Sequence, residues 1–448
     1  MLIFIQRVRN IEYINIDYIL KENIMYIHVV NRGDVMWKLA DYYHSTIPQI
    51  LEANGMTNPN QLLIGQSLVI PSEDYYLYKI RPKDTLWNIA NKYKVTVNEI
   101  LLNNTIENPN NLIVGTLINI PQKPKPTIEV NGYTYMFGDD AASIINEVGD
   151  YLTYMSPFAY LIRQDGTLQP IKDDAVINAA IQNNTLPMMC ITNFSLTSRG
   201  ENLASVVLNN PQIVEALQNN ILSTMRNKRY VGVNIDFENV LPKDREAYNN
   251  FLASTVNLFH REGYFVSTAL APKESAEQRG VLYEAHDYPF HGRVADFVVL
   301  MTYEWGWRGG PPQAISPIDK MRSVLEYAVS VMPRDKILMG FQIYARDWVL
   351  PHVQGQIAET FSEQEAMRRA YKYDAIIRYD EKAQSPYFNY KDEQGRQHEV
   401  WFEDARSAQA KFDLAKEFNL RGISYWALGY PFPQNWVLLD YNFDILKL

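Results

Sequence analysis

The chain contains an internal repeat. Residues 27–71 align without a gap with residues 77–121, and fifteen of the 45 aligned positions are identical. Self-similarity at a fixed offset indicates a duplicated structural unit. Each copy has a short strand, two amphipathic helical stretches and a closing strand that ends in Ile-Pro. The repeat therefore predicts two βααβ modules, at 26–71 and 76–121.

Two pairs of repeated residues carry structural expectations. Asp34 and Asp84 precede the first helical stretch of each module, and we expect them to cap that helix. Trp37 and Trp87 lie within the same stretch. Because a unit of about 45 residues needs most of its apolar side chains for its core, we expect both tryptophans to be packed inside.

The segments GDVMWKLADYY and KDTLWNIANKY, closed by GQSLVIP and GTLINIP, resemble LysM modules. The resemblance implies binding to polymers of N-acetylglucosamine, such as peptidoglycan or chitin, in a shallow groove between two loops of each module. It also implies which residues line the groove. They are Asp34, Met36 and Asn58 in the first module, and Asp84, Leu86 and Asn108 in the second.

Both modules are flanked by segments of different composition. Residues 1–25 form an N-terminal extension whose apolar patch is too short for a secretory signal, and its basic residues follow the patch rather than precede it. Met25, at the end of this extension, is an alternative translation start. Three prolines within 121–126 predict a stiff linker, so we expect a separate domain over 127–448.

Composition excludes several classes of function. The formal net charge of −9 argues against a nucleic-acid partner. A single cysteine, Cys190, excludes an internal disulfide and a zinc site built from cysteines, and the seven histidines include no His-Glu-x-x-His pattern. No apolar run approaches the ~18 residues of a membrane-spanning helix. We therefore expect no cofactor, no metal ion and no membrane insertion. A monomer is the expected oligomeric state.

The last 322 residues alternate short apolar runs with helical patterns. Eight strands with intervening helices predict an α/β fold, a closed (β/α)8 TIM barrel, with an open doubly wound sheet as the alternative. Residues 349–406, between strands seven and eight, predict a small α+β insertion. The expected strands are 128–136, 152–160, 186–194, 230–238, 264–271, 295–303, 336–344 and 422–428. The clearest helical stretches are 211–226, 243–262, 318–331 and 407–418.

The fourth strand carries acidic residues at alternate positions. Asn234, Asp236 and Glu238 face the same side of a strand and, in a barrel, its axis. Two carboxyl groups so close together raise the pKa of one of them, which keeps a general acid protonated near neutral pH. A purely structural acidic pair is the alternative from these residues alone.

The ends of strands four, six and eight together resemble glycoside hydrolase family 18. The segments are GVNIDFE, MTYE and a tryptophan, Trp426. The family usually has Asp where this chain has Asn234, and Asp or Asn where it has Glu304. The resemblance covers about 127–448.

The resemblance implies substrate-assisted retaining hydrolysis. Glu238 would be the general acid and base, Asp236 would hold the acetamido N–H of the substrate, and Tyr303 would bind the acetamido oxygen. Trp426 would lie beneath the cleaved sugar, and Asn234 would donate a hydrogen bond to Asp236. The other expected substrate-binding residues lie at the predicted barrel mouth. They are Asn193, Glu304, Trp305, Tyr344 and Arg346.

The order of two LysM modules, linker and barrel resembles the SleL/YaaH-type spore cortex-lytic N-acetylglucosaminidases. It implies hydrolysis of peptidoglycan on the spore of an endospore-forming bacterium, with the cell wall or the exterior as the alternative location. A chitinase with the same chemistry and a nearly inert spore-wall binding protein remain open as alternative functions.

Overall fold

The computed structural model describes residues 24–72, 77–93, 95–121, 125–194 and 201–448. Most of the expected N-terminal extension and the middle of the proline-rich linker lie outside these residues. The chain divides into two compact units, Met1–Lys125 and Pro126–Leu448. Within the described ranges, no helix has the length and apolar character needed to cross a bilayer.

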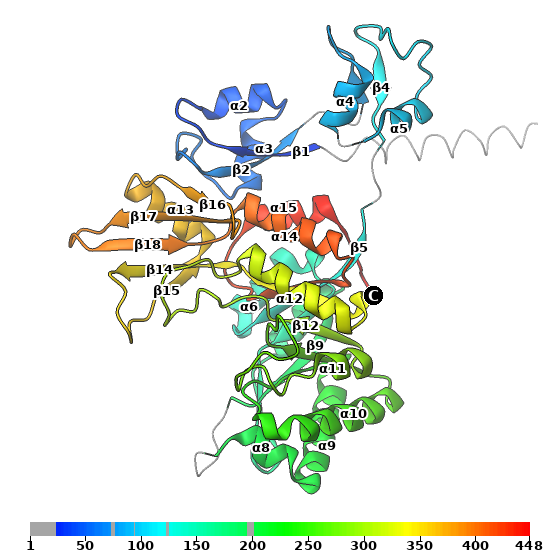
Figure 1. Cartoon of the computed structure of the whole chain (residues 1–448), viewed down its shortest axis with the longest axis vertical. Coiled ribbons are helices and arrows are strands. Elements are labelled where there is room, and N and C mark those ends of the chain that lie inside the picture. Colours follow the sequence, from blue (N-terminus) through cyan, green and yellow to red (C-terminus); the bar gives the residue numbers. More distant parts are fainter. Residues whose placement is uncertain (1–23, 73–76, 94, 122–124, 195–200) are drawn as a thin grey trace, which may run out of the picture. The chain divides into compact units, whose positions relative to one another are not determined.

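The first unit contains the two predicted βααβ modules (Figure 1). In each module the two strands pair antiparallel, and the two helices connect them. The first consists of β1 (Ile24–Val29), α2 (Met36–Tyr42), α3 (Ile47–Ala53) and β2 (Ser67–Ser72). The second consists of β3 (Leu77–Lys79), α4 (Leu86–Lys92), α5 (Val97–Leu102) and β4 (Leu117–Asn119).

The prediction that Trp37 and Trp87 are packed inside is wrong. Their exposed fractions are 61% and 67%. Helix α2 buries Met36, Leu39 and Ala40, which share one face. Trp37 is one residue after Met36 and therefore lies about 100° around the helix from it. Helix α4 repeats this arrangement around Trp87.

The expected helix caps are also wrong. Helix α2 begins after Val35, which makes no side-chain cap. The Asp34 carboxylate instead accepts hydrogen bonds from the backbone N–H of Asn31 at 2.7 Å and from His28 at 2.9 Å. Asp84 is likewise bonded within its turn, and Thr85 caps helix α4.

The second unit is the predicted closed barrel. Eight parallel strands follow one another around it, and the last pairs with the first, which excludes the open sheet. They are β5 (Thr127–Thr134), β6 (Tyr154–Pro157), β9 (Leu186–Thr192), β10 (Gly232–Asp236), β11 (Phe265–Leu270), β12 (Phe297–Leu300), β13 (Ile337–Gln342) and β19 (Gly422–Trp426). Three short strands accompany the barrel, namely β7 (Tyr160–Ile162), β8 (Leu168–Gln169) and β20 (Asp444–Ile445).

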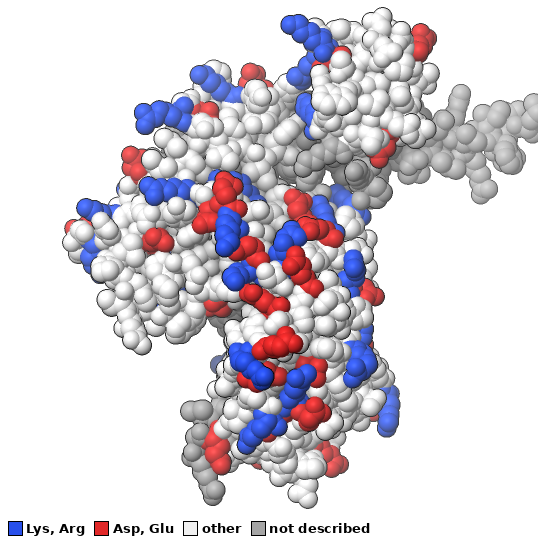
Figure 2. All heavy atoms as spheres, in the orientation of Figure 1, with Lys and Arg blue, Asp and Glu red and all other residues white. Residues whose placement is uncertain are grey.

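Helices connect and cover the strands. They are α6 (Gly138–Val148), α7 (Asp174–Gln182), α8 (Leu203–Leu208), α9 (Pro211–Lys228), α10 (Arg245–Arg261), α11 (Tyr288–Val294), α12 (Ile318–Val331), α14 (Ala405–Glu417) and α15 (Pro433–Asn442). Figure 2 shows basic and acidic side chains interspersed over the face that carries α12 and α14. One such pair, Arg322 and Glu417, joins these two helices.

The insertion between β13 and β19 forms an antiparallel sheet with one helix. Its elements are β14 (Tyr344–Leu350), β15 (Glu359–Ser362), α13 (Glu363–Lys372), β16 (Arg378–Asp380), β17 (Ser385–Lys391) and β18 (Gln397–Trp401). The sheet begins at Tyr344, five residues before the expected start, because β14 follows β13 with one residue between them. The expected α+β character is confirmed.

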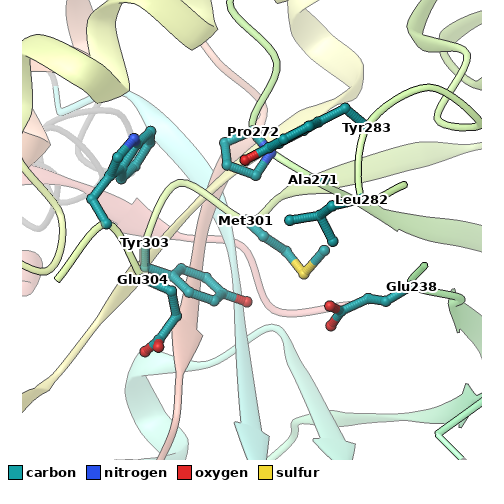
Figure 3. Close-up of a pocket in the computed structure, with 9 residues that line it drawn as sticks. Glu238, Ala271, Pro272, Leu282, Tyr283, Met301, Tyr303 and Glu304 are labelled. Carbon is teal, nitrogen blue, oxygen red and sulfur yellow. The ribbon is translucent and has the colours of Figure 1, made fainter. Parts of the chain in front are cut away.

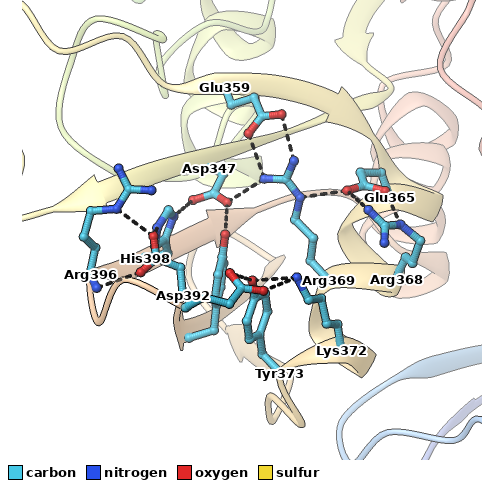
Figure 4. Close-up of polar contacts among 12 residues, drawn as sticks. Asp347, Glu359, Glu365, Arg368, Arg369, Lys372, Tyr373, Asp392, Arg396 and His398 are labelled. Carbon is cyan, nitrogen blue, oxygen red and sulfur yellow. Dashed lines mark hydrogen bonds and ion pairs between the residues drawn. The ribbon is translucent and has the colours of Figure 1, made fainter.

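A buried carboxylate holds the elements of the insertion together. Asp347 of β14 accepts hydrogen bonds from Arg369 of α13 at 2.8 Å, Tyr390 of β17 at 2.5 Å and His398 of β18 at 2.7 Å (Figure 4). Arg369 also pairs with Glu359 and thereby reaches β15. The side chain of Asp347 is 2% exposed, so these bonds compensate for the burial of its charge.

Candidate active site

Strand β10 directs polar residues into the barrel. Val233, Ile235 and Phe237 belong to the apolar core that includes helices α9 and α10. Asn234 and Asp236 alternate with them and are buried on the opposite side. Glu238 follows the end of the strand at Asp236 and lines a cavity at the barrel mouth. The predicted alternation of faces is therefore confirmed.

The two carboxyl groups of this segment favour their protonated forms. Burial, followed by repulsion from Glu238, raises the pKa of Asp236 well above its ordinary value. Burial, followed by repulsion from Glu304, also raises the pKa of Glu238. Oδ1 of Asp236 is buried and has no hydrogen-bond partner among the residues that the structure describes. A carboxyl group in this environment can keep a proton closer to neutral pH and donate it.

Asn234 does not make the expected hydrogen bond to Asp236. Its Nδ2 donates to Oγ of Ser267 at 2.9 Å, and its Oδ1 accepts from the Tyr133 hydroxyl at 2.9 Å. Ser267 is the residue opposite Asn234 in the register between β10 and β11, which places the two side chains next to each other.

Tyr303 and Trp426 come together as the sequence predicts. Their rings are stacked at 7°, with centroids 6.4 Å apart, and the Trp426 ring also contacts Phe158 at 4.6 Å. Burial, with repulsion from Asp236 next in size, raises the pKa of Tyr303 well above its ordinary value. The Tyr303 hydroxyl therefore remains a hydrogen-bond donor at neutral pH.

Glu304 connects the barrel mouth to the insertion. It accepts two hydrogen bonds from the Arg346 guanidinium, at 2.9 and 2.7 Å, and one from the Tyr344 hydroxyl. Arg346 also donates to the carbonyl oxygen of Gly306 at 2.5 Å, and its side chain is 5% exposed. Tyr344 and Arg346 thus both hold Glu304, and their expected contact with substrate stays a prediction.

Asn193 occupies the end of strand β9, directly beside Glu238. Its Oδ1 accepts a hydrogen bond from the Glu238 backbone N–H at 2.9 Å, and its Nδ2 donates to the Glu238 carbonyl oxygen at 2.8 Å. The amide expected to contact substrate is therefore bonded to the main chain of Glu238.

A cavity of about 150 Å³ lies at this end of the barrel (Figure 3). Glu238, Tyr303, Glu304 and Trp305 line it, and Figure 3 shows the Tyr303 hydroxyl and the Glu238 carboxyl pointing toward each other. The remaining lining residues of the cavity were not predicted from the sequence. They are Ala271, Pro272, Leu282, Tyr283 and Met301.

The alternation of side chains along a strand could have identified one of these residues, Met301. Met301 stands two residues before Tyr303, so alternation along that strand would have placed both on one side. Leu282 and Tyr283 belong to an irregular loop between β11 and α11, where no periodicity indicates which side chains point inward.

The residues expected to line the LysM grooves have mainly structural contacts. Met36 and Leu86 are each 3% exposed and lie in the module cores, and their place in a sugar-binding groove stays a prediction. Asn58 accepts a hydrogen bond from the backbone N–H of Asn60 at 2.9 Å, and Asn108 is bonded in the same way in the second module. These two asparagines, like Asp34 and Asp84, stabilise turns.

In the part of the chain that the structure describes, no group of three or more His, Cys, Asp or Glu side chains is arranged to hold a metal ion.

Comparisons with known proteins cover both units of the chain. The family model "Glycosyl hydrolases family 18" matches residues 171–430, and the LysM domain model matches residues 28–71 and 78–121. The cortical fragment-lytic enzyme of Bacillus subtilis (strain 168) is 52% identical over 430 residues, which cover 94% of this chain and 99% of that protein. The crystal structure of the Bacillus megaterium QM B1551 spore cortex-lytic enzyme SleL aligns with a TM-score of 0.84 and 41% identity, over 95% of this chain and all of that one.

Proposed function

The chain belongs to the glycosyl hydrolases of family 18 and carries two LysM domains, and on this basis we propose that it is a retaining β-N-acetylglucosaminidase acting on the peptidoglycan of the spore cortex. The single observation that carries the substrate is the 52% identity to a cortical fragment-lytic enzyme over nearly the whole length of both proteins. The spore is accordingly the proposed location. The LysM domains would retain the enzyme on its polymer, since two linked modules raise the effective concentration of each for a repeating ligand.

In the proposed reaction Glu238 protonates the glycosidic oxygen. The acetamido oxygen of the substrate attacks the anomeric carbon, the bond to the leaving sugar breaks, and an oxazolinium ion forms. Glu238 then removes a proton from water, which opens this ring with net retention of configuration. The raised pKa of Glu238 supports the role, because it keeps the acid protonated until the leaving group needs the proton.

Two neighbouring residues would control the acetamido group. Asp236 would accept a hydrogen bond from the acetamido N–H through its buried Oδ1, and on ionisation it would stabilise the developing positive charge. Tyr303 would donate its hydroxyl to the acetamido oxygen and so hold the attacking atom in line. Trp426, stacked on Tyr303, would provide an apolar surface beneath the sugar.

The substitution Glu238→Gln tests the assignment of the acid. It keeps the side-chain shape and removes the proton donor, so turnover of soluble cortex fragments should fall by about 10²–10⁴-fold while fragment binding persists. Glu246→Gln, at an exposed position of helix α10, is the matched control and should leave turnover unchanged. Near wild-type cleavage by the Glu238 variant would show that another group is the acid.

A digestion of purified cortex and of chitin oligomers, side by side and with product masses, tests the substrate. Faster cleavage of chitin oligomers would favour the chitinase alternative, and no cleavage of either would favour the wall-binding alternative. A protein that starts at Thr127 should cleave soluble fragments like the full chain but sediment less with intact peptidoglycan, because the avidity of the two modules is lost.

A further inference from the structure

The main chain of Glu238 lies beyond the hydrogen-bond ladder of the barrel. The last residue pair between β9 and β10 joins Thr192 to Asp236, so the sheet itself does not fix the next two residues. Asn239, which follows Glu238, has a positive φ of 53° and turns the chain away from the strand direction. The direction of the Glu238 side chain must therefore be set by other contacts.

Asn193 supplies the first of these contacts. Its side-chain amide bonds both the N–H and the carbonyl oxygen of Glu238, at 2.9 and 2.8 Å. A side-chain amide that accepts from the N–H of a residue and donates to the carbonyl oxygen of that residue makes the hydrogen bonds that a neighbouring strand would make. Asn193 thus continues the ladder of β9 past the point at which β10 ends.

His286 supplies the second contact, from the opposite side. Its Nε2 bonds the carbonyl oxygen of Phe237 at 2.9 Å, and its Nδ1 bonds the backbone N–H of Ala271 at 2.8 Å. A carbonyl can only accept and an N–H can only donate, so the proton is on Nε2. Burial lowers the pKa of His286 to about 4, which keeps this neutral form at neutral pH.

His286 also connects the acid to the wall of the cavity. Ala271 and Glu238 line the same cavity, and the backbone segments that carry them are bonded to the same imidazole ring. The ring is 1% exposed and cannot contact a substrate. Its two bonds therefore fix the end of β11 relative to the end of β10.

We propose that Asn193 and His286 are positioning residues that together clamp the peptide groups on both sides of the Glu238 α-carbon and thereby aim its carboxyl group at the glycosidic oxygen. This inference rests on the proposed role of Glu238 as the acid. The proposal assigns both residues to catalysis through Glu238 rather than to substrate binding. Because a displacement of about 1 Å can cost ~10²-fold in rate, loss of either contact should act mainly on kcat.

The test uses the full chain with soluble cortex fragments and compares Asn193→Ala and His286→Gln with the wild type. Asn193→Ala should lower kcat by about 10–100-fold and change KM by less than about twofold. His286→Gln retains one donor and one acceptor at a similar separation, so it should be closer to the wild type than His286→Ala. Equal kcat for all variants and the wild type would overturn the proposal.

His291→Ala is the matched control that separates the effect of His286→Ala from a general loss of stability. His291 is a second fully buried histidine, on helix α11, and it bonds Thr268 rather than the segment around Glu238. If this substitution lowers Tm as much as the substitution of His286 does, the variant should still keep the wild-type kcat. A fall in kcat equal to that of His286→Ala would mean that only packing is affected, and the proposal would be wrong.

A second comparison measures Asn193→Ala in the Glu238→Gln background. If Asn193 acts through the acid, its substitution should have little further effect once the acid is absent. The same fold-loss in both backgrounds would overturn the positioning role. High residual activity of Glu238→Gln alone would instead contradict the proposed acid, so the two failures are distinguishable.

Discussion

Arg346 provides the positive charge that compensates Glu304, and its replacement by methionine should affect both stability and activity. The substitution removes two charge-assisted hydrogen bonds to Glu304 and one bond to the carbonyl oxygen of Gly306. Breaking a buried ion pair by removal of one partner costs ~3–5 kcal/mol. The side chain of Glu304 is 31% exposed, so water partly replaces the lost bonds and we expect about 2–3 kcal/mol.

This loss converts into a measurable change in the melting temperature. The barrel unit, Pro126–Leu448, has an unfolding entropy of about 0.7 kcal/mol/K at ~2.1 cal/mol/K for each residue. The melting temperature of Arg346→Met should therefore fall by about 3–4 °C in calorimetry. The control is Arg322→Met, since its pair with Glu417 is 41% and 54% exposed and should contribute about 1 °C or less. Equal melting temperatures for the two variants would refute this reasoning.

The same variant should change the pH dependence of turnover. Repulsion from Glu304 already raises the pKa of Glu238, and an uncompensated Glu304 should raise it further. If Glu238 is the acid, turnover is lost as the pH rises through its pKa. The alkaline limb of the pH–rate profile of Arg346→Met should therefore move to higher pH, and an unchanged limb would contradict the assigned electrostatics.

Three further predictions concern other residues. Glu304→Gln removes the negative charge that faces Glu238, so the pKa of Glu238 should fall and the alkaline limb should move to lower pH. Asn234→Asp adds a carboxylate on the buried face of β10, which should oppose ionisation of the acidic cluster and move the acid limb to higher pH; superimposable profiles would show that this position does not affect the chemistry. Trp37→Ala and Trp87→Ala should each cost less than about 1 kcal/mol in denaturant titrations of the full chain, because both rings are mostly exposed, and a loss of about 3 kcal/mol would show that they are core residues.

The barrel could be predicted from the sequence because each of its strands is a short apolar run between helical patterns. Helix α12 begins and ends at the predicted residues, Ile318 and Val331. The inward direction of Asp236 followed from the period of two in a strand, which no tertiary contact can change without breaking the register.

The errors arose where a helix face or a turn decides the outcome. Trp37 belongs to an amphipathic stretch, but the choice between Met36 and Trp37 as the buried residue depends on where the helix begins. Aspartate is a favoured capping residue, but the Asp34 carboxylate accepts a hydrogen bond from the Asn31 N–H, in the turn that precedes the helix. Residue type alone does not show which backbone N–H group an aspartate will bind.

The contacts of Asn193 and His286 could not be predicted for a different reason. Both side chains bond backbone groups that are more than ten residues away in the sequence, and a backbone group has no sequence signature. Only the meeting of three strand ends at the barrel mouth brings them together. The sequence therefore indicated the proposed acid, Glu238, but not the contacts that hold its main chain.

The surroundings of Asn234 explain how this barrel accommodates an amide in place of the family's usual aspartate. Its Nδ2 donates to the Ser267 hydroxyl, and its Oδ1 accepts from the Tyr133 hydroxyl and, at 3.9 Å, from the Cys190 thiol. These partners match an amide, which both donates and accepts, whereas an ionised carboxylate only accepts and would need the Ser267 hydroxyl to turn and donate to it. Among the contacts that the structure gives Asn234, none is with a cation that would compensate a negative charge there. The protonation of this site is therefore governed by Asp236, Glu238 and the charge of Glu304, and residue 234 acts on it only through packing and hydrogen bonding.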